Sequence, residues 1–295
     1  MNRLLIFGLG YSGQAIATAA RTAGFEVSGT SRSGAPGAIP IGTVPIGTVP
    51  VGTIPFDAAD AAVAAATHVV TTVPPGEDGD PVLAHYAEAM RTAPALRWIG
   101  YLSSVVVYGD RGGAWVDEDT PAAPTQPRGH GRAAAEAAWS RFASRCAVDI
   151  FRLAGIYGPG RSALDEVRAG RARRMIKPGH VFGRIHRDDI GRAVVAAMRQ
   201  DRAPGVRVLN LADDEPAESA AVMAEAAALL DLPPPPEIRY QDALPTMSPM
   251  ARSFWAESRK VSSAKTKAAL GIAWLYPTYR EGLRAILQQG RDGPA

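Results

Sequence analysis

The amino-acid sequence predicts an α/β fold in which a doubly wound, mainly parallel sheet has helices on both faces and a smaller lobe beside it. Three observations predict this class. Short apolar runs alternate with alanine-rich segments over most of the chain, as in successive βα units. A glycine-rich turn follows the first apolar run. The length of 295 residues, with 46% hydrophobic and 21% charged residues, suits one large α/β domain with a small appendage.

The predicted elements follow one another in a regular order. Gly24 marks the turn between the first helix and the second strand, and Pro74 and Pro75 stop a later strand. Strands are expected at residues 4–8, 26–30, in a segment ending at 54–57, and at 68–73, 97–103 and 148–153, with helices at 13–23, 58–66 and 84–91.

The segment from Ile39 to Pro55 interrupts this order, because it reads IPIGTVPIGTVPVGTIP and repeats every five residues. Proline and glycine recur too often there for a regular central strand, so we expect an exposed, extended excursion. Such a segment could bind a partner, or it could be a tolerated surface loop lengthened by repeat expansion. We favour the surface loop.

The turn after the first predicted strand carries the clearest chemical motif, Gly8-Leu9-Gly10-Tyr11-Ser12-Gly13. A G-x-G-x-x-G between a strand and a helix is typical of a Rossmann dinucleotide-binding loop. The first glycine permits the tight turn, the second admits a pyrophosphate, and the third allows close packing, while the helix N-terminus favours negative charge. We therefore expect Gly8, Gly10, Tyr11, Ser12 and Gly13 to bind the cofactor.

The end of the second predicted strand indicates which dinucleotide binds. NAD-binding proteins usually place a carboxylate there, which accepts a hydrogen bond from the ribose 2′-hydroxyl. This chain has Ser31 and Arg32 instead, and a guanidinium beside a hydroxyl suits a 2′-phosphate. The sequence favours NADP(H), and NAD(H) remains the alternative. Arg32 would otherwise be an ordinary charge in a solvated loop.

Further motifs follow along the chain, namely LSSVVVYG at 102–109, RLAGIYGPG at 152–160, IHRDDI at 185–190, VLNLAD at 208–213, and a closing segment that includes Tyr276-Pro277. In this order and over most of the chain, they resemble the motifs of the extended short-chain dehydrogenase/reductases, also called the NAD-dependent epimerase/dehydratase family. The resemblance implies that Ser104 donates a hydrogen bond to the reacting oxygen. It also implies a nucleotide-binding Rossmann domain at 1–156 and 185–212, with a substrate-side lobe at 157–184 and 213–295.

The chain departs from this family at the Y-x-x-x-K pair, since arginines stand at both positions, Arg128 and Arg132. Arginine keeps its proton up to a pKa above about 12 and cannot replace the acid-base tyrosine. Arg132 could still hold the cofactor ribose, Arg128 could clamp an anionic substrate, and His130 could supply the proton. Tyr108 and Tyr157 are weaker candidates for the proton donor, and the alternative for His130 is an exposed residue of the loop or helix start.

A basic segment from Arg168 to Arg187 holds seven arginines and lysines and no acid. Such a run is usually a solvated face. In the family that the chain resembles, however, this region lies over the substrate, so Arg174 and Arg184 are expected to bind an anionic substrate, for example a nucleotide sugar. We expect His186 to have a structural role.

The sequence thus predicts an NADP(H)-dependent oxidoreductase or epimerase with Ser104, His130, Arg128 and Arg132 at its catalytic site. The alternative is a regulatory protein that senses NADP(H) and has lost catalysis. A net charge of +3 gives no case for nucleic-acid binding, and no apolar run is long enough to span a membrane. We expect a cytoplasmic location, no metal site, and a buried, unreactive thiol at Cys146. The sequence does not indicate an oligomeric state.

Overall fold

A central sheet of seven parallel strands organises the molecule, and the computed structural model describes it within residues 2–31 and 52–292. The strand order is β12-β7-β5-β4-β1-β2-β3, which is doubly wound as predicted. The strands are β1 (Arg3–Phe7), β2 (Glu26–Ser31), β3 (Gly52–Pro55), β4 (His68–Thr71), β5 (Trp98–Ser104), β7 (Ala147–Leu153) and β12 (Gly205–Leu211).

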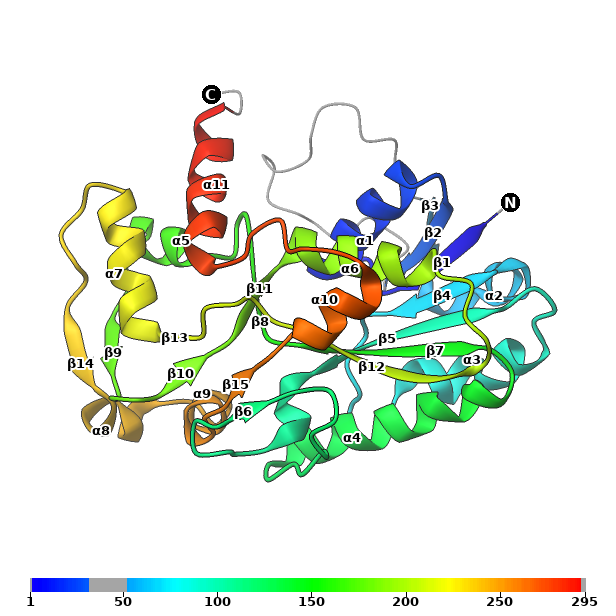
Figure 1. The fold of residues 1–295 in the computed structure, drawn as a ribbon, viewed down its shortest axis with the longest axis horizontal. Coiled ribbons are helices and arrows are strands. Elements are labelled where there is room, and N and C mark those ends of the chain that lie inside the picture. Colours follow the sequence, from blue (N-terminus) through cyan, green and yellow to red (C-terminus); the bar gives the residue numbers. More distant parts are fainter. Residues whose placement is uncertain (1, 32–51, 293–295) are drawn as a thin grey trace.

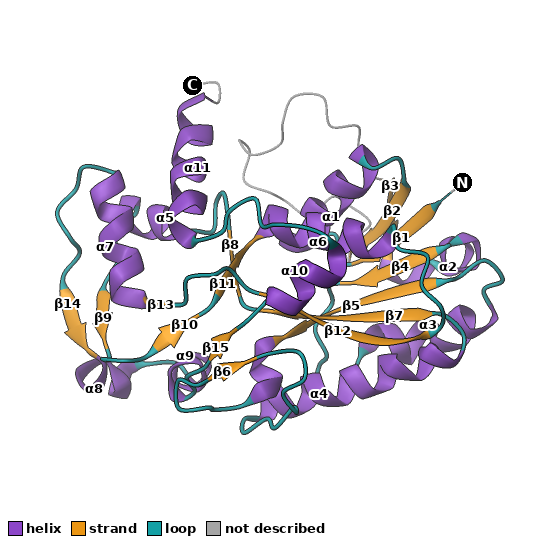
Figure 2. Ribbon diagram, viewed as in Figure 1, coloured by secondary structure: helices purple, strands orange, loops and turns teal. Residues whose placement is uncertain are grey.

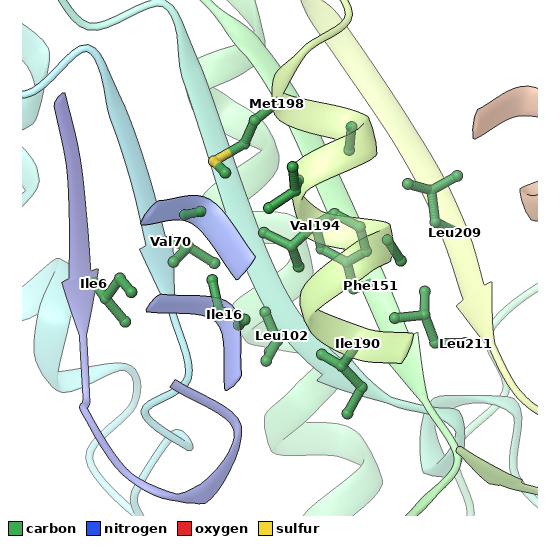
Figure 3. Packing of buried hydrophobic residues seen from close by; sticks show 14 of the residues in the cluster. Ile6, Ile16, Val70, Leu102, Phe151, Ile190, Val194, Met198, Leu209 and Leu211 are labelled. Atoms are coloured by element: carbon green, nitrogen blue, oxygen red, sulfur yellow. The ribbon is translucent and has the colours of Figure 1, made fainter. Parts of the chain in front are cut away.

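Helices cover both faces of this sheet (Figures 1 and 2). On one face α1 and α6 pack side by side over the first core cluster, whose members include Ile6, Phe151 and Val194 (Figure 3). On the other face α2, α3 and α4 cover a second cluster. These helices are α1 (Tyr11–Thr22), α2 (Asp60–Ala65), α3 (Pro81–Thr92), α4 (Pro127–Ser140) and α6 (Arg187–Met198).

The element types along the sheet follow the sequence prediction, and the boundaries differ by a few residues. Helix α3 begins at Pro81, earlier than expected, because the Asp80 side chain caps it and accepts hydrogen bonds from Val82 N and Leu83 N. The end of the repeat segment, Gly52–Pro55, forms the edge strand β3. Residues 32–51, which hold most of the repeat, lie outside the described residues.

The lobe lies beyond the carboxyl ends of the strands, at the left of Figure 1, and is built from short elements. Short strand pairs form the lobe and its junction with the sheet, namely β8 (Gly155–Tyr157) with β11 (Arg184–His186), β9 (Arg174–Ile176) with β14 (Glu237–Arg239), β10 (Val181–Phe182) with β13 (Ala217–Glu218), and β6 (Trp115–Val116) with β15 (Lys260–Val261).

The lobe's own core lies between three helices and is lined by Tyr157, Leu164, Ala226 and Leu283 among others. The later chain does not stay in the lobe, because Leu270 and Trp274 return to the first core cluster against the sheet. The helices of this part are α5 (Ala163–Arg168), α7 (Ser219–Leu229), α8 (Tyr240–Ala243), α9 (Pro249–Ala256), α10 (Ala264–Leu270) and α11 (Tyr279–Asp292).

Candidate functional site

The glycine loop connects β1 to α1 at the carboxyl edge of the sheet. Gly8 has a φ of +92°, which L side chains rarely adopt. A Cβ on Gly13 would lie 2.1 Å from the carbonyl oxygen of Gly8, so only glycine fits there. A Cβ on Gly10 would meet no heavy atom of the described chain within 4 Å, and this residue caps α1 without a side-chain hydrogen bond. The backbone N–H groups at the start of α1 are therefore open to an anion.

The end of β2 holds this loop in place. The backbone N–H of Leu9 donates to Thr30 O at 2.9 Å, and that of Gly8 donates to Thr30 Oγ1 at 3.2 Å. Ser31, the last residue of β2, is half-buried beside the loop. Arg32 falls outside the described residues, so the prediction that rests on it stays a prediction.

Tyr11, the first residue of α1, joins the loop to the lobe. Its hydroxyl donates to Pro159 O at 3.1 Å, and the guanidinium carbons of Arg187 and Arg161 lie 5.0 and 5.6 Å from its ring centre. A Cβ on Gly158 would lie 2.6 Å from the Tyr11 hydroxyl, so this approach requires glycine. Burial raises the pKa of Tyr11 to about 12 despite both arginines. Sequence reasoning missed Arg161 and gave Arg187 no specific role.

Ser104 ends β5, opposite Leu153 of β7, and is half-buried. Its hydroxyl accepts a hydrogen bond from Val106 N at 3.4 Å. Tyr108, four residues further, is fully buried, and its hydroxyl donates to Asn210 Oδ1 at 2.7 Å. Burial raises the pKa of Tyr108. Tyr108 thus packs beneath the sheet end, in keeping with its weak standing as a proton donor.

The first turns of α4 carry Arg128, His130 and Arg132. Arg132 reaches the sheet, where its guanidinium donates to Leu102 O at 2.8 Å and to the Tyr101 hydroxyl at 3.2 Å. The structure therefore brings Arg132 to the strand that ends at Ser104. Arg128 and His130 are exposed, and no hydrogen bond is seen between either side chain and another described residue.

The two arginines expected to bind substrate have different surroundings. Arg174 links β9 to the segment before β14, since it donates to Pro235 O at 2.8 Å and pairs with Glu237 at 3.0 Å. Arg184 donates to Phe182 O at 3.0 Å and to Ala217 O at 3.2 Å, with its guanidinium carbon 5.8 Å from the ring centre of Tyr279.

His186 and Cys146 have structural surroundings. His186 is 1% exposed and caps α6, because its Nδ1 accepts a hydrogen bond from Asp188 N at 3.2 Å. Burial is the main reason that the pKa of His186 falls to about 4. Cys146 is buried, and burial raises the pKa of its thiol to about 11, which disfavours the nucleophilic thiolate.

Two kinds of site or segment are absent from the residues that the structure describes, 2–31 and 52–292. Within them, no group of three or more histidine, cysteine or acidic side chains is arranged to hold a metal ion. No helix there combines the length and apolar character needed to cross a bilayer.

Known proteins resemble this chain over nearly its whole length. No protein-family model matches the sequence. Among solved structures, MoeE5 in complex with UDP-glucuronic acid and NAD covers 98% of the chain and 99% of its own, at 20% identity and a TM-score of 0.74. The human epimerase family protein SDR39U1 with NADPH covers 97% and 99%, at 19% identity and a TM-score of 0.73. The chain therefore shares with these proteins an α/β Rossmann-like fold, which is the fold class that the sequence predicted.

Two other proteins are more similar to this chain in sequence than MoeE5 and SDR39U1 are. A functionally unknown conserved protein of Silicibacter pomeroyi DSS is 40% identical, with 98% of this chain and 99% of that one covered and a TM-score of 0.82. The chain belongs to the same family as that protein. Protein YeeZ of Escherichia coli is 29% identical over 248 residues, which are 80% of this chain and 86% of YeeZ.

Proposed function

We propose that the chain is an NADP(H)-binding oxidoreductase or epimerase that acts on a polar or anionic carbonyl compound. The observation that carries the proposal is the loop from Gly8 to Gly13, in which the start of α1 has no side-chain cap and the space at Gly10 is open. A dinucleotide diphosphate fits this cradle, because the glycines leave room for it and the helix N–H groups face it.

Each predicted residue has a place in this proposal. The start of α1, with Tyr11 and Ser12, would hold the diphosphate, while Ser31 and Arg32 would hold the 2′-phosphate. Bound NADP(H) supplies the hydride acceptor or donor. Ser104 would donate a hydrogen bond to the substrate oxygen at the end of β5.

The residues on α4 complete the proposed site. Arg132, fixed against Leu102 and Tyr101, would orient the ribose, and His130 would supply the proton from the exposed start of the helix. The exposed guanidinium of Arg128 would attract an anionic substrate group. The UDP-glucuronic acid bound by MoeE5 supports an anionic substrate of this class.

A second function has its own supporting observation. With Arg128 and Arg132 in place of the tyrosine and lysine, and Arg132 hydrogen-bonded to β5, the chain could sense NADP(H) without catalysis. A substrate-panel assay that follows NADPH absorbance separates the two functions. Turnover that Ser104→Ala abolishes supports the enzyme, whereas tight NADPH binding without turnover supports the sensor.

The cofactor proposal is tested by direct binding of NADPH and NADH. Gly13→Ala places a methyl group against Gly8 and should weaken binding of both nucleotides at least about tenfold, whereas Gly131→Ala, at an open helical position, should leave binding unchanged. Arg32→Ala should weaken NADPH binding and spare NADH. Wild-type protein that binds neither nucleotide would refute the proposal, and equal affinities in wild type and Arg32→Ala would remove the preference for NADP(H).

A further inference from the structure

Two helices start side by side next to the glycine loop. Helices α1 and α6 pack against each other, and a Cβ on Gly191 of α6 would lie 2.8 Å from Ala15 O of α1. One turn before these residues each helix begins, α1 at Tyr11 and α6 at Arg187. Because the N-terminus of a helix carries a partial positive charge, two such charges lie close together beside the proposed cofactor loop.

Arg187 adds a full positive charge at this place. It is the first residue of α6, where the helix dipole disfavours a cation. Its side chain is only 15% exposed, and its guanidinium carbon lies 5.0 Å from the centre of the Tyr11 ring. Its Nε is buried without a hydrogen bond, 3.5 Å from Oδ1 of Asp188, and no hydrogen bond from its Nη groups to a described residue is seen. A largely buried arginine normally has acceptors for its N–H groups.

Arg161 brings a second guanidinium to the same tyrosine from the lobe. Its guanidinium carbon lies 5.6 Å from the centre of the Tyr11 ring. The side chain is exposed, and in the described part of the chain no carboxylate pairs with it. The Tyr11 hydroxyl donates to Pro159 O at 3.1 Å, which fixes the ring between the glycine loop and the lobe. An aromatic ring attracts a guanidinium without using its N–H donors, so these donors stay available to an anion.

Two acids near Tyr11 have donors of their own. Asp165, in the first turn of α5, accepts hydrogen bonds from the backbone N and the hydroxyl of Ser162, at 2.8 and 2.6 Å. Asp188, in the first turn of α6, lies 3.7 Å from Nδ1 of His186 and beside Nε of Arg187. The two arginines lower the pKa of Tyr11 more than the two acids raise it. The positive charge at this place therefore exceeds what the acids offset.

We propose that Arg187 and Arg161 bind the diphosphate of the dinucleotide at the glycine loop, with Tyr11 positioning both guanidinium groups. A diphosphate offers several charged oxygens, which accept the paired N–H donors of a guanidinium. The backbone N–H groups at the start of α1 would bind the same diphosphate from the loop. This inference rests on the proposed cofactor site and adds to it two residues that lie outside the glycine motif.

Titration of the full-length protein with NADPH and with NADH tests the inference, because both nucleotides carry the diphosphate. Arg187→Met should weaken binding of both by the same factor, about tenfold to a hundredfold, and Arg161→Met, at an exposed position, by about threefold to tenfold. The matched control is Arg199→Met. Arg199 lies at the other end of α6, where its guanidinium donates to Ala23 O at 3.2 Å, so its replacement should leave both affinities unchanged.

Salt dependence separates a direct contact with the diphosphate from a structural effect on the loop. Salt screens the attraction between a guanidinium and a phosphate, so the loss of affinity in Arg187→Met should shrink between about 0.05 and 0.5 M NaCl. Arg187→Lys keeps the charge and should recover part of the affinity for both nucleotides. A loosened loop would instead give a loss that neither salt nor lysine changes.

The outcomes distinguish this inference from the cofactor proposal. If Arg187→Met and Arg161→Met bind both nucleotides as tightly as wild type, or if salt and Arg187→Lys leave the loss unchanged, the inference is overturned and the cofactor proposal stands. Wild-type protein that binds neither nucleotide refutes the cofactor proposal, and this inference with it. If circular dichroism shows that Arg187→Met does not fold, Arg161→Met carries the same titration and salt series.

Discussion

Two buried acid–arginine pairs join the sheet to its surroundings, and they differ in how their polar atoms are satisfied. Glu136 of α4 accepts hydrogen bonds from Arg152 at 3.1 and 2.8 Å and from Ser103 at 2.5 Å. Asp213, just after β12, accepts a long bond from the backbone N of Arg184, and its Oδ2 has no partner among the described atoms.

The two pairs therefore contribute differently to the stability of the fold. Burial opposes the charge of Arg152, but its bonds to Glu136 outweigh burial and raise its pKa, so this pair fixes α4 against β7. Burial instead raises the pKa of Asp213, and the guanidinium of Arg184 donates to Phe182 O and Ala217 O rather than to this carboxyl. A satisfied buried network stabilises the structure, whereas a buried carboxyl with an unpaired oxygen costs stability when it is charged.

The largest loss of stability is expected when the hydrogen-bonded pair of Glu136 and Arg152 is broken. Arg152→Met leaves the buried carboxylate of Glu136 without its cation and should lower the free energy of unfolding by about 3–5 kcal/mol. Urea denaturation followed by circular dichroism measures the loss.

The matched control for that variant is the double substitution Glu136→Leu with Arg152→Met, which removes both charges. It should regain most of the stability, because no unpaired charge remains. A loss below about 1 kcal/mol in the single variant would contradict a structural role for this pair.

The second prediction concerns the pH dependence of the unsatisfied pair. The carboxyl of Asp213 has a pKa of about 8 when folded, against 3.8 as its ordinary value. At pH values between these two, the folded chain therefore keeps a proton on Asp213 that the unfolded chain releases. This group's contribution to stability is complete below 3.8 and is lost as the pH rises through about 8. Asp213→Asn should flatten this decline and be more stable than wild type above pH 8, by about 2 kcal/mol.

Urea denaturation at several pH values measures that change. Asp201→Asn, at an exposed residue that is not among the charges acting on Asp213, is the matched control and should keep the wild-type decline. If Asp213→Asn shows the same decline as wild type, the two acid–arginine pairs do not differ in the way argued above.

The order of strands and helices could be predicted from sequence because each long element repeats its own apolar period. The glycine loop could be predicted because close contacts within it leave room only for glycine, for example where Gly13 lies against the carbonyl oxygen of Gly8. The paired strands of the lobe could not, since two or three residues are too few for a period. The start of α3 was placed late because the prediction overlooked the cap at Asp80.

Only part of the candidate site could be predicted from sequence, because the rest depends on side-chain contacts between segments that are distant along the chain. The basic segment and the family resemblance gave Arg174 and Arg184 the same expected role, yet Arg174 pairs with Glu237 and Arg184 donates to Phe182 O and Ala217 O. The approach of Arg161 and Arg187 to Tyr11 likewise depends on how the lobe folds back over α1. Nothing in the spacing of these residues could indicate it.

The smallest expected effect is a difference in stability between variants of two buried tyrosines, Tyr108 with a hydrogen-bonded hydroxyl and Tyr279 with an unpaired one. Tyr108 donates a hydrogen bond to Asn210, so Tyr108→Phe should lower the free energy of unfolding by about 1 kcal/mol, since Asn210 loses a partner. Tyr279 has no such partner in the described structure, so Tyr279→Phe should leave the ligand-free stability unchanged or raise it by up to about 1 kcal/mol. Thermal and urea unfolding in phosphate-free buffer measure both. Equal losses in the two variants would mean that the Tyr279 hydroxyl has a hydrogen-bond partner within the fold.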